Sequence, residues 1–309
     1  MTSEPTVSVV MTTRAEPLAR VERALASVAA QDYAGDIEVI VAMPVGDQAP
    51  YSARVVDNPS GARCAGLNRA VAVATGEVVV RLDARSSFPV DYLRRCVQRL
   101  QSDATVGVVG GVQLARAGSR TTLAAGIARA LRNPWATGGA AYRRVGGGGA
   151  ADTVYLGVFR RAELLSVDGW DEQLDANEDF DLCQRYQRAG FTVWLEPQLA
   201  VAYEARATLR DVWSQYLAFG RSKTRYWRLR GERPSKRQLA PLVVAPLFAA
   251  VALWKPLTIV AAAVGLVAVD HAADPGERDA RVRLVSLVAY VPIIGGWVSG
   301  VVAEALRRD

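Results

Sequence analysis

The chain has 309 residues, of which 50% are hydrophobic, and its 37 Lys and Arg against 31 Asp and Glu give a formal net charge of +6. This length and apolar fraction suit about two domains with their own cores, which excludes a disordered chain and a small disulfide-stapled scaffold. The only histidine is His271, and the three cysteines, Cys64, Cys96 and Cys183, lie far apart. The counts exclude a Cys/His zinc site and a Ser-His or Cys-His catalytic pair.

The first two-thirds of the sequence alternates apolar runs with helix-like segments. Strands are predicted at residues 7–11, 37–42, 78–82 and 106–112, and helices from Pro17, over 61–74, from Pro89 and over 121–132. Apolar strands separated by helices indicate an α/β fold whose parallel sheet is covered on both faces. Ligands bind such sheets beyond the carboxyl ends of the strands, here residues 12–16, 43–47 and 83–86.

A strongly basic segment follows at residues 205–237, where ten Lys and Arg face only Asp211 and Glu232. Basic residues interleaved with aromatic ones can bind nucleic acid. The segment instead leads into two apolar stretches, 239–269 and 284–303. These stretches favour a membrane as the partner and disfavour nucleic acid.

The two apolar stretches allow more than one membrane arrangement. About 20 apolar residues span a bilayer core of about 30 Å, whereas the 31 residues of 239–269 would form a helix of about 46 Å. The pairs Lys255-Pro256 and, in the second stretch, Pro292 with Gly295-Gly296 are breaks, so re-entrant or interfacial hairpins are one reading. The other reading is two membrane spans with both ends in the cytosol. Basic residues at the outer ends and an acidic loop at 270–281 favour it. The basic segment would then lie along an anionic leaflet.

Three strings carry a family resemblance: VSVVMTTRAEP, CAGLNRAVAVATGEVVVRLDARS and DTVYLGVFRRAELLSVDGWDEQLDANEDFDLCQRYQRAG. They resemble family 2 glycosyltransferases of the GT-A fold, most closely the succinoglycan-biosynthesis type, over about residues 5–235. The resemblance implies a mixed, mostly parallel sheet with helices on both faces, followed here by a C-terminal membrane-associated helical region. It also implies inverting transfer of a sugar from a nucleotide-sugar to a hydroxyl.

The implied domain organisation has three parts. A GT-A catalytic domain covers residues 1–204, with the nucleotide-sugar half at 1–115 and the acceptor half at 116–204. A basic amphipathic juxtamembrane helix covers 205–237, and membrane-associated helices cover 238–309.

Inverting transfer needs a carboxylate to take the acceptor's proton and a cationic group to stabilise the leaving diphosphate. Asn177, Glu178 and Asp179 supply two carboxylates where a helix is predicted to begin, with Asn177 as its cap. The resemblance places the catalytic base on Asp179, beside Glu178; the alternative is an ordinary acidic first turn. Trp170 and Asp171 match the motif on the acceptor side.

Asp83-Ala84-Arg85 stands where the family has Asp-x-Asp, whose carboxylates hold the Mg²⁺ or Mn²⁺ that bridges the diphosphate. Arg85 replaces the second Asp, which puts metal use in doubt and predicts weakened metal dependence. Arg85 would pair with the diphosphate, and Asp83 would contact the ribose or a remaining metal ion. The alternative is a surface salt bridge of Arg85.

Further nucleotide contacts are implied at Thr12, Arg14, Glu16, Arg63 and Asn68, which could instead be surface polar or helix-capping residues. A UDP-sugar is the expected donor. However, Ala42-Met43-Pro44 replaces the position whose Asp commonly reads uracil, and only Asp47 matches a later Asp of that pattern.

The processive members of the superfamily carry a Gln-x-x-Arg-Trp motif, and the spacing of Gln215 and Arg221 does not match it. A single sugar addition is therefore expected, with the Gln215 region near the leaving diphosphate. The expected acceptor is a lipid-linked glycan, and the expected location is the cytoplasmic membrane with the catalytic domain facing the cytosol.

Two other classes of function compete with this interpretation. A nucleotidyltransferase uses a similar sheet but carries a Gly-rich loop after the first strand, and residues 12–16 contain no glycine. A catalytically decayed membrane-attached scaffold would explain Arg85 and Met43, although Glu178 and Asp179 are intact.

Overall fold

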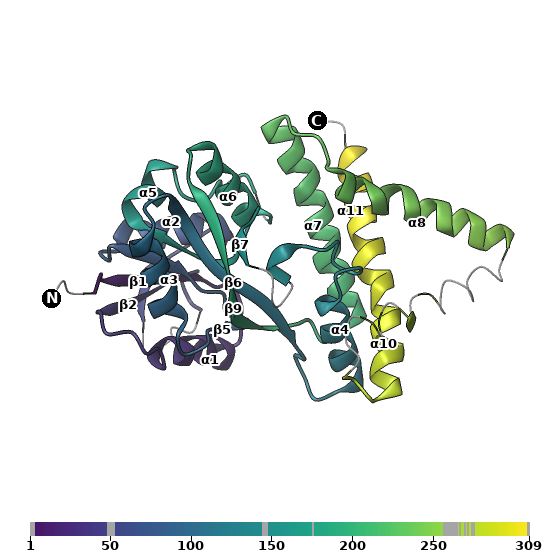
Figure 1. Cartoon of the computed structure of the whole chain (residues 1–309), viewed down its shortest axis with the longest axis horizontal. Coiled ribbons are helices and arrows are strands. Elements are labelled where there is room, and N and C mark those ends of the chain that lie inside the picture. The colour runs from purple at the N-terminus through teal and green to yellow at the C-terminus, as the bar shows by residue number, and fades with distance from the viewer. Residues whose placement is uncertain are drawn as a thin grey trace. The chain divides into compact units, whose positions relative to one another are not determined.

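The computed structural model describes residues 4–47, 53–143, 148–174, 176–255, 265, 267–268, 270, 272 and 276–307. They belong to two compact units (Figure 1). The first comprises Met1–Leu114 and Arg144–Tyr203, and the second comprises Ala115–Arg143 and Glu204–Asp309. Each unit is described by itself below.

The first unit is built on a mixed sheet. Its strands are β1 (Val7–Thr12), β2 (Ile37–Met43), β3 (Arg54–Asp57), β4 (Val78–Arg81), β5 (Ser86–Ser87), β6 (Val106–Arg116), β7 (Gly149–Ala150), β8 (Tyr155–Arg160) and β9 (Thr192–Glu204). They are ordered β3-β2-β1-β4-β8-β6-β9-β5, and β7 pairs with β9. Strands β3, β2, β1 and β4 are parallel, whereas β8 is antiparallel to both β4 and β6. The four predicted strands are present, but β8 separates the third of them from the fourth.

Among the described residues, five helices accompany the sheet in the first unit. They are α1 (Leu18–Ala29), α2 (Arg63–Val73), α3 (Tyr92–Ser102), α5 (Arg161–Ser166) and α6 (Glu178–Arg188). All five residues from Val7 to Met11 are buried, and because successive strand side chains point to opposite faces, both faces must be covered. Helix α2 lies directly against the carboxyl end of β1: a Cβ on Gly66 would stand 2.3 Å from Thr12 Oγ1. This close approach brings the start of α2 to the end of the sheet where ligands are expected.

The second unit is helical. It contains α4 (Thr122–Arg132), η1 (Ala141–Arg143), α7 (Leu209–Arg230), α8 (Lys236–Trp254), α10 (Ala280–Tyr290), η2 (Val291–Gly295) and α11 (Gly296–Ala305). The backbones of α7 and α11 touch, because a Cβ on Gly220 would lie 2.2 Å from the carbonyl oxygen of Trp297. Helix α4 packs on α10 and belongs to this unit, although residues 116–204 are predicted above to form an acceptor half. That functional division stays a prediction.

The break predicted at Pro292 is instead a π-helical turn, η2, inside one helix that runs over Ala280–Ala305. A wider turn of this kind absorbs the missing amide of a proline without ending the helix. Among the described residues this is the one helix long and apolar enough to cross a membrane, and 44% of its most apolar window is buried. The break predicted at Lys255-Pro256 coincides with the end of α8 at Trp254, and Pro256 itself lies outside the described residues.

Candidate active site

A buried arginine joins the end of the sheet to the start of α6. Arg81, the last residue of β4, is 1% exposed. Its Nε donates to Asp83 Oδ1 at 2.9 Å, and one terminal nitrogen, Nη2, donates to Glu178 Oε1 at 3.0 Å. The other terminal nitrogen donates to Asp179 Oδ1. One planar guanidinium therefore fixes three carboxylates, and two of them, Glu178 and Asp179, lie 97 and 98 residues from Arg81 in the sequence.

Glu178 is the buried anchor of this cluster. It is 3% exposed, and Arg63 at the start of α2 donates to the same Oε1 at 3.1 Å. Burial alone would raise the pKa of Glu178, but the charges of Arg63 and Arg81 outweigh it and hold that pKa below its ordinary value. Burial would likewise raise the pKa of Asp83, but the charges of Arg81 and Arg63 outweigh it and lower that pKa. Both carboxylates stay ionised at neutral pH.

Asp179 differs from its neighbours in access and in acidity. Its side chain is 29% exposed, and Trp170 Nε1 donates to Oδ1 at 3.3 Å. Burial, helped by the negative charges of Glu178 and Asp83 and opposed by Arg81, raises the pKa of Asp179 to about 6. An accessible carboxyl group that titrates near neutrality is suited to accept a proton.

The turn that carries Trp170 is held by Asn68 of α2. The Asn68 amide donates to the Trp170 carbonyl at 2.8 Å and accepts from the Trp170 backbone nitrogen at 2.9 Å. Trp170 is 1% exposed and packs edge-on against Phe159, with ring centroids 5.8 Å apart. Asn68 thus positions Trp170, and its predicted contact with the nucleotide stays a prediction. Asp171 closes the same turn by accepting from Gln173 N at 2.9 Å.

Helix α6 begins where the sequence predicted. Asn177 precedes its first residue in the left-handed conformation, with φ of 62°, and forms no side-chain cap hydrogen bond with the helix. The first turn carries Glu178, Asp179 and Asp181, whose negative charges suit the positive end of the helix dipole. The acidic turn is therefore both a stable helix start and the source of the site's carboxylates.

The residues predicted to contact the nucleotide gather at the carboxyl ends of the parallel strands. Thr12 Oγ1 accepts from Asn58 at 3.4 Å, and the Arg14 side chain covers Gly61, where a Cβ would stand 2.7 Å from Arg14 Cδ. Arg85 lies 3.4 Å from Glu16, so the loops after β1 and β4 meet. The salt bridge considered for Arg85 is present, although its side chain is only 18% exposed.

The Asp-x-Asp pattern that would hold Mg²⁺ or Mn²⁺ is reduced here to one carboxylate, Asp83, because Arg85 stands at the second Asp position. Divalent ions of this kind take several oxygen ligands. Both carboxylate oxygens of Asp83 already accept from Arg81, at 2.9 and 3.3 Å, and Arg85 offers no lone pair. Within the part of the chain that the structure describes, no group of three or more His, Cys, Asp or Glu could hold a metal ion.

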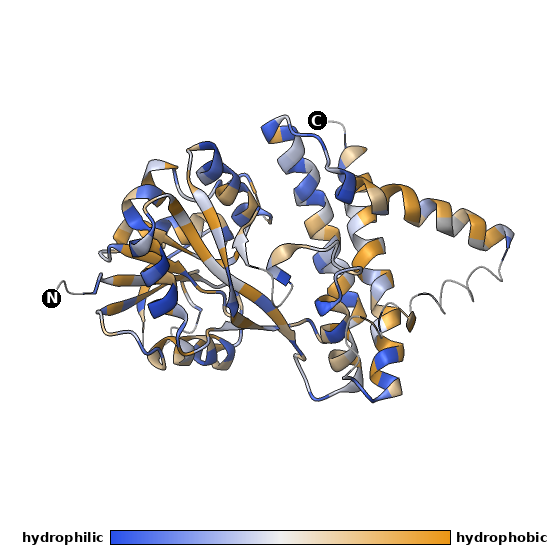
Figure 2. Ribbon diagram, viewed as in Figure 1, coloured by the Kyte–Doolittle hydropathy of each residue, from blue (hydrophilic) through white to orange (hydrophobic). Residues whose placement is uncertain are grey.

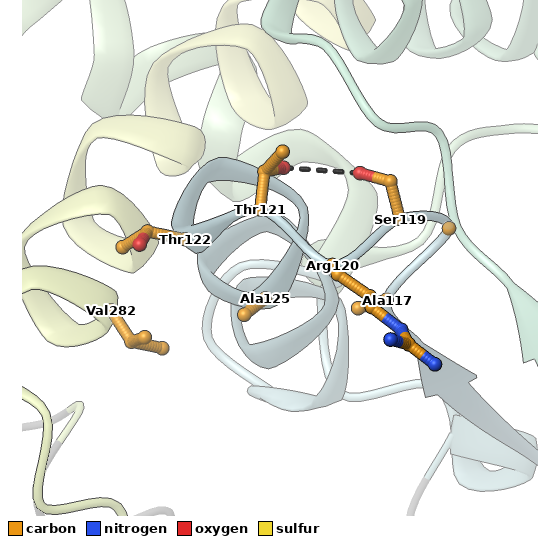
Figure 3. Close-up of a pocket in the computed structure, with 8 residues that line it drawn as sticks. Ala117, Ser119, Arg120, Thr121, Thr122, Ala125 and Val282 are labelled. Atoms are coloured by element: carbon orange, nitrogen blue, oxygen red, sulfur yellow. Dashed lines mark hydrogen bonds between the residues drawn. The ribbon is translucent and has the colours of Figure 1, made fainter.

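Two predicted residues lie elsewhere. Gln215 and Arg221 are on α7, in the second unit, whereas the cluster around Arg81 is in the first. The second unit also has a surface hollow of about 560 Å³ where α4 begins, next to Val282 of α10 (Figure 3). Its lining contains none of the predicted site residues.

Arg81 and Asn58 are not among the site residues that the sequence predicts. Arg81 ends an apolar run of three valines, and Asn58 is fully buried after β3. An arginine at the end of a strand that is buried throughout is unusual unless it is paired, and this is the signal that could have identified it. For Asn58 only the tertiary contact with Thr12 reveals a role.

Comparisons with known proteins agree with this geometry. A family model described as glycosyltransferase like family 2 matches residues 5–222. The succinoglycan biosynthesis protein ExoA of Rhizobium meliloti is 30% identical over 194 residues, which are 62% of this chain and 58% of that protein. The pre-mycofactocin glycosyltransferase of Mycobacterium tuberculosis is 29% identical over 150 residues, 48% of this chain and 30% of that protein. The matches thus cover less than two-thirds of either relative.

Solved structures share the fold. The mannosyltransferase PcManGT from Pyrobaculum calidifontis, solved with GDP-Man and Mn²⁺, has a TM-score of 0.61 at 19% identity and covers 100% of this chain and 89% of its own. GalNAc-T7, solved with UDP, GalNAc and Mn²⁺, has a TM-score of 0.50 at 14% identity, over 65% of this chain and 43% of its own. The mixed α/β fold predicted from the sequence is confirmed as GT-A-like.

Replacing Arg81 by leucine should destabilise the first unit by about 3–5 kcal/mol, because three clustered carboxylates lose their shared cation. The loss should be larger at pH 8 than at pH 5, where the unpaired carboxylates can take up protons. Urea unfolding at both pH values measures it. Arg94→Leu removes an exposed pair with Asp32 and should leave stability nearly unchanged. Equal losses in both variants would contradict a structural role for the Arg81 cluster.

Proposed function

The chain belongs to glycosyltransferase family 2, and from this premise we propose that it transfers one sugar, with inversion, from a nucleotide-sugar to a hydroxyl of a lipid-linked or cell-envelope glycan. The observation that supports this most is Asp179: a partly exposed carboxyl group, held by Arg81 and Trp170, with a pKa of about 6.

Asp179 acts as the general base in this proposal. The acceptor oxygen attacks the anomeric carbon while the bond from that carbon to the diphosphate oxygen breaks on the opposite side. Asp179 takes the hydroxyl proton, and the bonding electron pair leaves with the diphosphate. Because Arg81 and Trp170 both hold Oδ1, we assign the proton to Oδ2. Glu178 and Arg81 position the base and do not touch the substrate.

The donor would lie along the loops that follow β1, β2 and β4. Thr12, Arg14 and Glu16 line this edge, and Arg63 and Arg85 are the cations offered to the leaving diphosphate. The Arg63 side chain is 46% exposed, so it can reach a ligand while it pairs with Glu178. We propose that the donor is a UDP-sugar, with Asp47 as the polar group near its uracil ring. Asp47 accepts from the Ala15 backbone at 3.1 Å and so joins the loops after β2 and β1.

A membrane-bound acceptor is supported by the second unit. Helix α8 exposes large apolar side chains, including Leu253 at 89% and Trp254 at 78%, and Figure 2 shows it as largely hydrophobic. We propose attachment to the cytoplasmic membrane with the catalytic unit facing the cytosol. Gln215 and Arg221, on the basic helix α7, would then serve the diphosphate of a lipid carrier.

Replacing Asp179 by asparagine should lower transfer by about 10²–10⁴-fold while donor binding is kept, because the amide cannot take the proton. UDP-, GDP- and dTDP-sugars would be supplied to the purified full chain with a membrane-lipid extract. Product formation and donor binding are both measured, and Asp32→Asn is the control with an exposed carboxylate. Unchanged transfer by Asp179→Asn would contradict this base, and no donor binding by the unaltered chain would favour a scaffold.

The acid limb of the pH profile should fall near pH 6. Asp179 must be ionised to accept a proton, so kcat/KM should drop about tenfold per pH unit once the pH is below the pKa of about 6. Initial rates at saturating acceptor across this range measure it. A limb near the ordinary aspartate value of 3.8 would show that burial does not raise the pKa of the base.

Metal removal should leave most of the turnover. Asp83 is the one carboxylate left of the motif and accepts from Arg81, and Arg85 takes the place of the usual second carboxylate. Rates with EDTA and with added Mn²⁺ should therefore agree within a few-fold. Arg85→Asp restores the Asp-x-Asp pattern and should make turnover more sensitive to EDTA. Complete loss of activity of the unaltered chain in EDTA would refute this.

A further inference from the structure

A buried ion pair ties the C-terminal region to α4. Arg129 of α4 and Asp270 have side chains 1% and 4% exposed, and Arg129 Nη2 lies 2.8 Å from Asp270 Oδ2. Arg129 Nε donates to both oxygens of the same carboxylate at 3.0 and 3.1 Å, and Ser286 of α10 donates to Oδ1 at 3.0 Å. A buried pair with this many hydrogen bonds is a specific contact and not a chance surface encounter.

This contact restricts where Asp270 can be relative to a membrane. The chain enters α4 shortly after β6 and returns to the sheet at β7, so both ends of α4 are tied to the catalytic unit. Its 11 residues give a helix of about 16 Å, too short to cross a hydrocarbon core of about 30 Å. Helix α4 is therefore on the side of the membrane where the sheet is, and Asp270 must be there too.

The apolar stretch 239–269 then begins and ends on one side. It follows α7, which starts five residues after β9, and it stops next to Asp270. A segment with both ends on one side crosses the membrane twice or not at all. Two crossings need about 40 residues, and the stretch has 31. It does not cross.

The helix Ala280–Ala305 is held on the same side at both ends. Near its start, Ser286 contacts Asp270. Near its end, Arg225 of α7 donates to Glu304 Oε1 at 2.8 Å, and Arg228 donates to the Glu304 carbonyl at 2.8 Å. The second half of α7 carries five basic residues, Arg221, Lys223, Arg225, Arg228 and Arg230, so it does not enter hydrocarbon.

We propose that the described helices of the second unit rest in one leaflet without crossing the membrane, with Asp270, Ala272 and residues 276–281 on the catalytic side. This rests on the membrane attachment proposed above. The lipid-contacting surface is α8 together with the outer stripe of the helix Ala280–Ala305. That stripe exposes Leu284 by 64%, Val288 by 46% and Val291 by 68%, while the opposite face packs on α4 and α7.

Charge indicates which lipid surface this fits. The apolar surface of α8 begins directly after Arg233, Lys236 and Arg237, all exposed. Basic residues at the root of an apolar helix match the anionic headgroups of a cytoplasmic leaflet, and the exposed aromatic Trp254 suits the interface. The partner of this surface is thus an anionic bilayer, and the acidic residues near Asp270 are not on the far side of that bilayer.

Cysteine labelling tests the topology. Arg278→Cys and Ala272→Cys place a thiol at exposed positions of the loop, and Gln101→Cys on α3 marks the catalytic side. The three native cysteines are buried and give little background. In sealed membrane vesicles from expressing cells, a membrane-impermeant maleimide should label positions 272 and 278 from the same side as position 101. Labelling of the loop from the opposite side only would overturn the proposal.

Vesicle binding tests the lipid-contacting surface. The purified full chain should float with vesicles of phosphatidylcholine and phosphatidylglycerol and bind phosphatidylcholine alone more weakly. Val243→Asp with Leu247→Asp should weaken binding about a hundredfold, since both side chains leave the hydrocarbon. The control Val90→Asp, exposed on the first unit, should not. If Val90→Asp weakened vesicle binding as much as the double variant, or if the unaltered chain did not float, the proposed lipid-contacting surface would be wrong. Sugar transfer is measured separately, so that failure of the lipid-contacting surface can be told apart from failure of the glycosyltransferase proposal.

Discussion

The candidate site depends on the placement of one buried guanidinium. Arg81 ends a strand inside the sheet, where an unpaired cation would carry a large desolvation cost. Asp83, Glu178 and Asp179 compensate that cost, and each of these carboxylates needs the same cation in return. Because neither side of the cluster is stable without the other, the end of β4 and the start of α6 are held together.

The cluster also separates the roles of two adjacent acids. Glu178 points into the cluster, where Arg63 and Arg81 keep it ionised. Asp179 remains partly open to solvent, and its pKa is raised by burial and by its negative neighbours. Neighbouring carboxyl groups whose surroundings move their pKa values in opposite directions are a common arrangement for an acid–base site.

Arginine–carboxylate ion pairs recur in both units of the chain. Arg81, Arg63 and Arg85 each contact an acidic side chain at the end of the sheet. In the second unit, Arg129 pairs with Asp270 and Arg225 pairs with Glu304. Glycines allow α7 and α11 to approach closely. Ion pairs of this kind require precise partners, so they determine which helices of the second unit meet.

The sequence by itself determined the strand–helix alternation, the edge of the sheet at which a ligand is expected and the acidic start of α6. These features are local: apolar periodicity defines the elements, and parallel strands place their carboxyl ends at one edge. The sequence also predicted roles for Asp179 and Arg85, through motifs whose residues are contiguous in the chain, and those roles stay predictions.

Only the tertiary structure decided which distant groups meet. The insertion of β8 between β4 and β6, the pairing of Arg81 with α6 and the pairing of Arg129 with Asp270 all join residues separated by long stretches of chain. Hydropathy also left open whether the helix Ala280–Ala305 faces lipid or protein, because a buried core helix and a membrane span have the same composition. Packing against α4 and α7 gives that helix a protein-facing side, and this depends on long-range contacts that no local pattern contains.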